Sequence, residues 1–180
     1  MRELRFARKG SEAATALVVF LHGYGADGAD LLGLADVLGP QLPGVAFVAP
    51  DAPERCAGGG FGYQWFPIPQ FDGSTEAQRQ AGIDASADDL NGFLDARLLE
   101  AGLASDRLVL FGFSQGAMMS LHVAPRRTEP VAGVGAISGR SWTKAFTISV
   151  RSRSGTPTTP TIATAGCFIR HSSISPGPMR

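Results

Sequence analysis

The apolar run at residues 108–113 ends abruptly in Gly-Phe-Ser-Gln-Gly, and this junction constrains the fold more than any other feature of the chain. The run is typical of a buried β-strand, and the residues after it begin a helix. Gly112 and Gly116 flank Ser114, and only residues without Cβ fit on either side of so sharp a reversal. The sequence therefore predicts a strained turn that exposes the Ser114 hydroxyl at a helix N-terminus.

Strand and helix patterns alternate along the chain up to residue 139. Leu4 and Phe6 alternate with charged residues, as on an edge strand. Continuous apolar runs, typical of strands covered on both faces, lie at residues 16–21, 45–48, 108–113 and 131–137. Helical spacing is found over residues 27–38 and from a cap at Ser74 or Thr75 to Gly102. Such alternation predicts an α/β fold with a mainly parallel sheet and helices on both faces.

Composition limits the classes of function. A chain of 180 residues with 44% hydrophobic content can build one core, and its sixteen basic and sixteen acidic residues cancel. We therefore expect no nucleic-acid partner, and the lack of a long apolar stretch predicts neither a membrane span nor a signal peptide, hence a cytoplasmic protein. Cys56 and Cys167 lack metal-ligand spacing, so we expect reduced thiols and no metal site.

Ser114 is the candidate nucleophile, because the Gly-x-Ser-x-Gly pattern falls directly between a strand and a helix, where nucleophilic serines are positioned. The alternative is a serine that only caps the helix N-terminus. A second glycine-rich segment, His-Gly-Tyr-Gly at 22–25, follows the strand at 16–21. It could place the backbone N–H of Tyr24, together with that of Gln115, at a developing oxyanion. His22 and His122 are expected to be structural residues.

The alternative for this glycine-rich segment is a phosphate cradle, but the sequence has neither Gly-x-x-x-x-Gly-Lys-Ser/Thr nor Gly-x-Gly-x-x-Gly there. Four motifs instead follow one another in a fixed order: Leu-His-Gly-Tyr-Gly (21–25), Ala-Pro-Asp-Ala-Pro (49–53), Gln-Trp-Phe (64–66) and Gly-Phe-Ser-Gln-Gly (112–116). Together they resemble the phospholipase/carboxylesterase family of α/β hydrolases, which includes the acyl-protein thioesterases. The resemblance covers roughly residues 3–139.

The resemblance implies an α/β hydrolase fold, with Ser114 as nucleophile and Tyr24 and Gln115 as oxyanion donors. It also implies that Trp65 and Phe66 line the substrate pocket near the acyl site. The expected partners are small-molecule acyl esters or thioesters of short or medium chain length, and no metal or organic cofactor is implied. Nothing in the sequence predicts the oligomeric state.

The C-terminal part departs from this family. Residues 130–180 contain no Asp or Glu, although the residues before them hold all sixteen. Members of the family carry there the segments that supply a triad acid and a histidine base, and neither segment is recognisable. Residues 141–180 are instead dominated by Ser, Thr, Pro, Arg and Ile, with no sustained period. We therefore expect an incomplete hydrolase domain over 1–140, with its last strands missing or aberrant, and an aberrant or poorly ordered segment over 141–180.

Three explanations fit this segment: an alternative C-terminus, a flexible tail, or a change of reading frame near codon 140, which is our hypothesis. If neither other frame of the gene encodes an Asp-containing strand and a late histidine, the hypothesis is wrong. His171 is the late histidine present and thus the candidate base, while the triad acid is unknown. Asp27, Asp51 and Asp84 precede Ser114, which is the wrong order for this fold.

Two function classes remain open. The first is a serine carboxylesterase or thioesterase that acts through Ser114. The second is a catalytically impaired, truncated or frame-shifted hydrolase without the triad Asp and His, at most a binder of acyl ligands.

Overall fold

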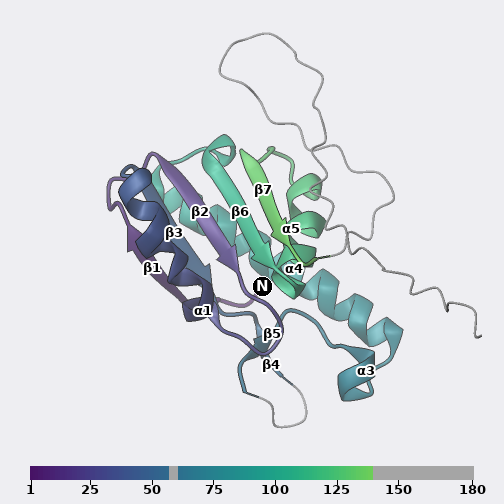
Figure 1. Cartoon of the computed structure of the whole chain (residues 1–180). Coiled ribbons are helices and arrows are strands. Elements are labelled where there is room, and N and C mark those ends of the chain that lie inside the picture. Colours follow the sequence, from purple (N-terminus) through teal and green to yellow (C-terminus); the bar gives the residue numbers. More distant parts are fainter. Residues whose placement is uncertain (57–60, 140–180) are drawn as a thin grey trace, which may run out of the picture.

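A five-stranded sheet forms the centre of the computed structural model, which describes residues 1–56 and 61–139 (Figure 1). The strand order is β1-β3-β2-β6-β7, in which β1 runs antiparallel to β3 and the other neighbours are parallel. The strands are β1 (Phe6–Gly10), β2 (Ala16–Leu21), β3 (Val45–Pro50), β6 (Leu108–Phe113) and β7 (Gly133–Ile137). The predicted mainly parallel sheet is confirmed, with an antiparallel edge strand close to where Leu4 and Phe6 indicated one.

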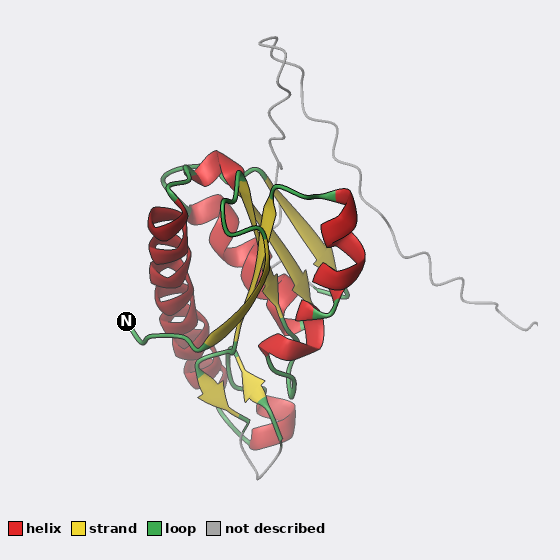
Figure 2. Cartoon of the chain, turned by 90° about the vertical axis from the view of Figure 1, so that its left-hand side faces the viewer, coloured by secondary structure: helices red, strands yellow, loops and turns green. Residues whose placement is uncertain are grey.

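The sheet is covered on both faces because the side chains of β2 alternate between two apolar clusters. Leu17, Val19 and Leu21 face α4 (Glu76–Ala101) and α5 (Gln115–Val123). Val18 and Phe20 face the opposite layer, built by α1 (Gly28–Leu32) and α2 (Leu34–Leu38). Figures 1 and 2 show these two layers of helices on either side of the sheet. This arrangement confirms the expected helices on both faces.

The long helix α4 begins and ends at the predicted signals. Thr75 is its N-cap, and its side chain accepts a hydrogen bond from Gln78 N at 3.2 Å, while the Gln78 side chain binds Thr75 N at 2.7 Å. Gly102 ends the helix in the left-handed conformation, with φ 64°. The buried residues of α4, among them Leu90 and Leu94, pack against the sheet.

Two expected segments differ in detail from the prediction. The helix predicted over 27–38 is divided at Gly33 into α1 and α2, because glycine weakens a helix interior and Asp27 caps only the first piece. The segment 54–73 contains short elements in its described part: β4 (Glu54–Arg55), β5 (Tyr63–Gln64) and α3 (Pro69–Asp72). Single turns of 3₁₀ helix lie at Gly39–Gln41, Ser105–Arg107 and Ala124–Arg126.

The strand β7 is the last described element of the chain, and its one described neighbour is β6. The predictions for residues 141–180, including the boundary at 140, the missing last strands and Cys167, lie outside the described residues. Within the described ranges, no helix has both the length and the apolarity needed to cross a membrane. The same ranges contain no cluster of His, Cys, Asp and Glu suited to a metal ion.

Candidate active site

Ser114 lies in a strained turn between β6 and α5. Its backbone angles are φ 51° and ψ −114°, which a residue with a Cβ adopts only at a cost. Neighbouring segments hold the turn in place, because Ser114 N donates to Ile137 O at 2.9 Å and Ser114 O accepts from Met118 N at 3.1 Å. The predicted strained turn is therefore present.

The two flanking glycines permit this turn by close approach of backbone atoms. A Cβ on Gly112 would overlap the carbonyl oxygen of Gly116, and a Cβ on Gly116 would overlap the carbonyl oxygen of Leu21. The Ser114 side chain makes no capping hydrogen bond to α5. Ser114 thus occupies the N-cap position of α5, but its hydroxyl does not bond to the helix backbone.

The glycine-rich segment after β2 lies directly beside Ser114. Leu21 and Gly112 are partners in the parallel pairing of β2 with β6, so both strands deliver their carboxyl ends to the same edge. A Cβ built on Gly23 would lie 3.4 Å from Ser114 Cβ. Within the described chain, neither the Tyr24 nor the Gln115 backbone N–H has a hydrogen-bond acceptor. The two expected oxyanion donors therefore lie near Ser114, and their N–H groups have no acceptor within the described chain.

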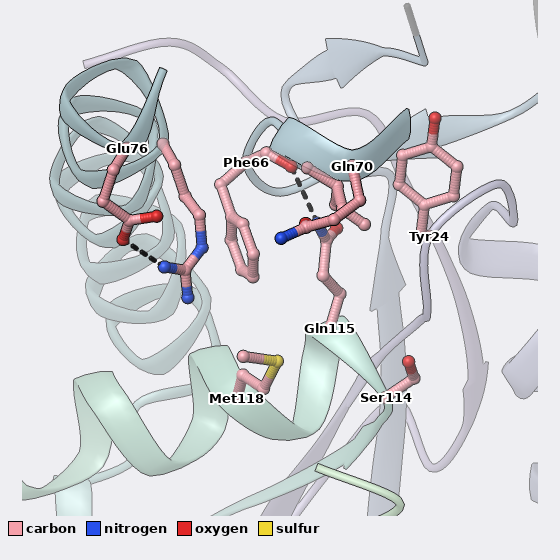
Figure 3. A pocket seen from close by; sticks show the side chains of 9 residues that line it. Tyr24, Phe66, Gln70, Glu76, Ser114, Gln115 and Met118 are labelled. Atoms are coloured by element: carbon pink, nitrogen blue, oxygen red, sulfur yellow. Dashed lines mark hydrogen bonds and ion pairs between the residues drawn. The ribbon is translucent and has the colours of Figure 1, made fainter. Parts of the chain in front are cut away.

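The role expected for Tyr24 concerns its backbone N–H and not its side chain. Figure 3 shows its hydroxyl pointing away from Ser114. Burial raises the pKa of the Tyr24 phenol, and the neighbouring Cys56 and Asp72 raise it further, so the side chain stays neutral.

His22 is locked into the scaffold, as expected. Its Nδ1 lies 2.7 Å from Gly23 O and its Nε2 accepts from Ala52 N at 2.9 Å. Because the first partner is an acceptor and the second a donor, the imidazole is neutral with its proton on Nδ1. Burial lowers the pKa of His22, which is consistent with a neutral ring. Both ring nitrogens are thus occupied, and His22 ties the end of β2 to the segment after β3.

His122 cannot serve Ser114 either, because it follows Ser114 by eight residues, or ~12 Å along the axis of α5. Burial lowers the pKa of His122, and the charge of Arg126 lowers it further. His171, the predicted base, lies outside the described residues.

The three upstream acids are each engaged elsewhere in the described structure. Asp27 caps α1, Asp51 accepts from Gly28 N at 2.9 Å, and Asp84 accepts from Gln80 Nε2 at 2.9 Å. The described residues therefore assign neither a base nor an acid to Ser114.

A cavity of about 330 Å³ opens beside Ser114 (Figure 3). Its lining residues are Tyr24, Phe66, Ile68, Gln70, Glu76, Arg79, Ser114, Gln115 and Met118. Phe66 is among them, but Trp65 is not, which corrects the expectation that both aromatics line the pocket. Trp65 is fully buried in the core, where its indole Nε1 donates to His22 O at 3.0 Å. Through this hydrogen bond, Trp65 holds the start of the glycine-rich segment from the core side.

The sequence indicated a role for the backbone N–H of Gln115 but gave no signal for the role of its side chain. Its Oε1 accepts from Trp65 N at 2.9 Å, and its Nε2 donates to Phe66 O at 2.7 Å. The Gln115 amide therefore clamps the aromatic segment onto the start of α5. Met118 was also missed, although it follows Ser114 by four residues, about one turn of α5, and lines the same cavity.

The sheet, the two helical layers and the serine turn after β6 define the class of α/β hydrolases. The chain belongs to the phospholipase/carboxylesterase family, whose sequence profile matches residues 4–166. The matched range thus continues beyond residue 139, where the resemblance recognised in the sequence ends.

The relatives carry related names. The chain is 33% identical over 174 residues to acyl-protein thioesterase 1 of Mycosarcoma maydis, a match that covers 90% of this chain and 70% of the relative. Among solved structures, the chain is 38% identical to esterase PE8, with a TM-score of 0.70 over 77% of this chain and 65% of that one. A phospholipase/carboxylesterase from Dyadobacter fermentans is 25% identical, with a TM-score of 0.56 over 81% and 66% of the two chains. The chain spans about two thirds of the length of these proteins.

Proposed function

We propose that this protein hydrolyses carboxylic esters or thioesters of short- to medium-chain acids with Ser114 as the nucleophile. The main support for this proposal is the strained turn. It places the Ser114 hydroxyl at the wall of a cavity, next to two backbone N–H groups that have no acceptor within the described chain. The names of the relatives support the same class of substrate.

In the proposed mechanism, Ser114 Oγ attacks the carbonyl carbon of the ester while a base takes its proton. The negative charge that develops on the carbonyl oxygen is stabilised by the N–H groups of Tyr24 and Gln115 and by the N-terminus of α5. The leaving alcohol or thiol takes the proton, and water then releases the acid from Ser114. His171 is the proposed base, and the acid that would orient it is unassigned.

The cavity supports an acyl substrate because Phe66, Ile68 and Met118 give it apolar walls. A hydrocarbon chain buried against these side chains gains free energy in proportion to the area removed from water. The two backbone N–H groups proposed to bind the carbonyl oxygen lie at the Ser114 end of this cavity. The proposed partner is therefore a small-molecule ester or thioester.

Hydrolysis of p-nitrophenyl butyrate by the wild type and by Ser114→Ala tests the proposal. We expect the wild type to exceed the uncatalysed rate and Ser114→Ala to return to background. Ser105→Ala is the control, because Ser105 lies before β6, where its hydroxyl donates to Glu129 O at 3.0 Å, and takes no part in the site. A fluorophosphonate should label the wild type on Ser114 and leave Ser114→Ala unlabelled.

Equal background rates and no labelling in the wild type and Ser114→Ala would contradict the proposal. Such a result would favour the second candidate, a catalytically impaired hydrolase that binds acyl ligands. The observation behind this candidate is that His22 and His122 are both unable to serve Ser114.

A further inference from the structure

The cavity beside Ser114 has two chemically different ends. Ser114 lies at one end, and Glu76 lies at the other, beyond Phe66 and Met118 (Figure 3). The Glu76 carboxylate forms an ion pair with the guanidinium of Arg79, one turn further along α4. Phe66 and Met118 therefore lie between the candidate nucleophile and a pair of charges.

The position of this ion pair is fixed by the start of α4. The capping box of Thr75 and Gln78 sets the first turn of the helix, which carries Glu76. The Arg79 guanidinium carbon lies 5.9 Å from the centroid of the Phe66 ring, and the Arg79 side chain is only 22% exposed. The charge of Arg79 thus stands against the apolar wall, while Glu76, 71% exposed, reaches toward water.

We propose that the Arg79–Glu76 pair determines specificity by ending the acyl site and limiting the length of the acyl chain. The proposal rests on the function proposed for Ser114. An alkyl chain that reached the pair would remove water from both charges and offer no hydrogen bond in return, which is unfavourable. Methylene groups between Ser114 and the pair gain free energy by burial, and those beyond it gain none.

The charges of this pair also disfavour binding of an acyl group with an anionic end. The Glu76 carboxylate already matches the charge of Arg79, so a substrate carboxylate at this end would face Glu76 as well. The cavity therefore fits a short, uncharged alkyl chain.

The first test compares kcat/KM for p-nitrophenyl acetate, butyrate, hexanoate, octanoate and decanoate in the wild type and in Arg79→Met. Methionine keeps an unbranched stem and removes the charge. We expect the wild type to gain about fourfold per methylene, which corresponds to about 0.8 kcal/mol, until the chain meets the pair, and then to lose activity. In Arg79→Met the gain should continue to longer chains, and Arg79→Lys should restore the wild-type limit.

Arg97→Met is the matched control. Arg97 lies on the same helix, forms an ion pair with Glu100 three residues away at 3.1 Å, and stacks 4.4 Å above the Phe6 ring. The Arg97 side chain is 23% exposed, close to the 22% of Arg79, but Arg97 does not line the Ser114 cavity. We expect the chain-length profile of Arg97→Met to match that of the wild type.

A second measurement needs no turnover. Calorimetry follows the binding of butanol, hexanol, octanol and decanol to Ser114→Ala and to Ser114→Ala/Arg79→Met. We expect the gain in affinity per methylene to stop in the first protein and to continue in the second. If the wild type fails to hydrolyse any ester, the function proposed for Ser114 is wrong. The alcohol series alone then tests whether the Arg79–Glu76 pair limits the length of a bound alkyl chain.

The same chain-length limit with and without Arg79 would overturn the inference. So would a preference of the wild type for p-nitrophenyl hydrogen succinate that Arg79→Met abolishes, because Arg79 would then bind an anionic acyl end.

Discussion

The side chain of Gln115 donates a hydrogen bond from Nε2 to the backbone oxygen of Phe66 at 2.7 Å, and both residues are buried. The same side chain accepts from Trp65 N through Oε1. The residue directly after the candidate nucleophile therefore also holds one wall of the cavity.

Replacing Gln115 by Ala should destabilise the fold and disturb the cavity. The substitution removes both hydrogen bonds of the Gln115 amide and leaves the buried Trp65 N–H without its acceptor, at about 1 to 3 kcal/mol. Urea unfolding measures the loss. Gln70→Ala is the control, because Gln70 lines the same cavity but is exposed, and it should change stability by less than about 0.5 kcal/mol. Equal stability of the two variants would contradict the clamp.

Alanine should have opposite effects at two glycines. At Gly116, a Cβ would overlap the Leu21 carbonyl oxygen, so Gly116→Ala should lose about 3 kcal/mol or fail to fold. Gly33 has φ −58° between α1 and α2, and a Cβ there meets no atom within 4 Å. Gly33→Ala should therefore raise the free energy of unfolding by about 0.4 to 1 kcal/mol. Thermal unfolding distinguishes the two signs, and a stable Gly116→Ala would show that the turn can relax.

The strain at Ser114 should be visible in stability. Ser114→Gly and Ser114→Ala both remove the hydroxyl, but only glycine adopts φ 51° without penalty. Relief of strain of about 1 to 3 kcal/mol, reduced by the greater freedom of glycine in the unfolded chain, should make Ser114→Gly more stable than Ser114→Ala by about 1 kcal/mol. The comparison needs only chemical unfolding of the two variants. An Ala variant at least as stable would mean that the turn carries no strain.

Stability should fall as the pH decreases below about 6.5. Burial lowers the pKa of His22 below its ordinary value of 6.5, so the unfolded chain binds a proton more readily than the folded one. The stabilisation by neutral His22 is therefore complete above pH 6.5 and is lost as the pH falls toward the folded-state pKa, by at most about 1.4 kcal/mol per pH unit.

His122 acts in the same direction, because its pKa is also lowered. Urea unfolding between pH 7.5 and 5 should therefore show the decline in the wild type and, somewhat reduced, in His122→Gln. Nuclear magnetic resonance of the His22 ring in His122→Gln should show a neutral imidazole below pH 6.5. A stability that stays level or rises on acidification would contradict the account.

Local features of the sequence predicted the elements well. Thr75 and Gly102 marked the ends of α4, because capping needs only residues that are close in the chain. The glycines around Ser114 predicted the strained turn, since the crowding they relieve includes atoms only four residues apart, as between Gly112 and Gly116. The division of the first helix at Gly33 was missed because single glycines are tolerated in many helices.

The sequence by itself determined the strands of the central sheet, the caps of α4, the serine turn and the family of the chain, because consecutive residues encode periodicity, capping and steric crowding. Only the tertiary structure decided that Phe66 lines the cavity while Trp65 supports it from the core. It also decided that Gln115 clamps residues about fifty positions away and that Glu76 and Ser114 line opposite ends of one cavity. These contacts arise because parallel strands bring segments that are distant in the sequence to one edge of the sheet. The spacing of residues along the chain does not predict which of these segments come into contact.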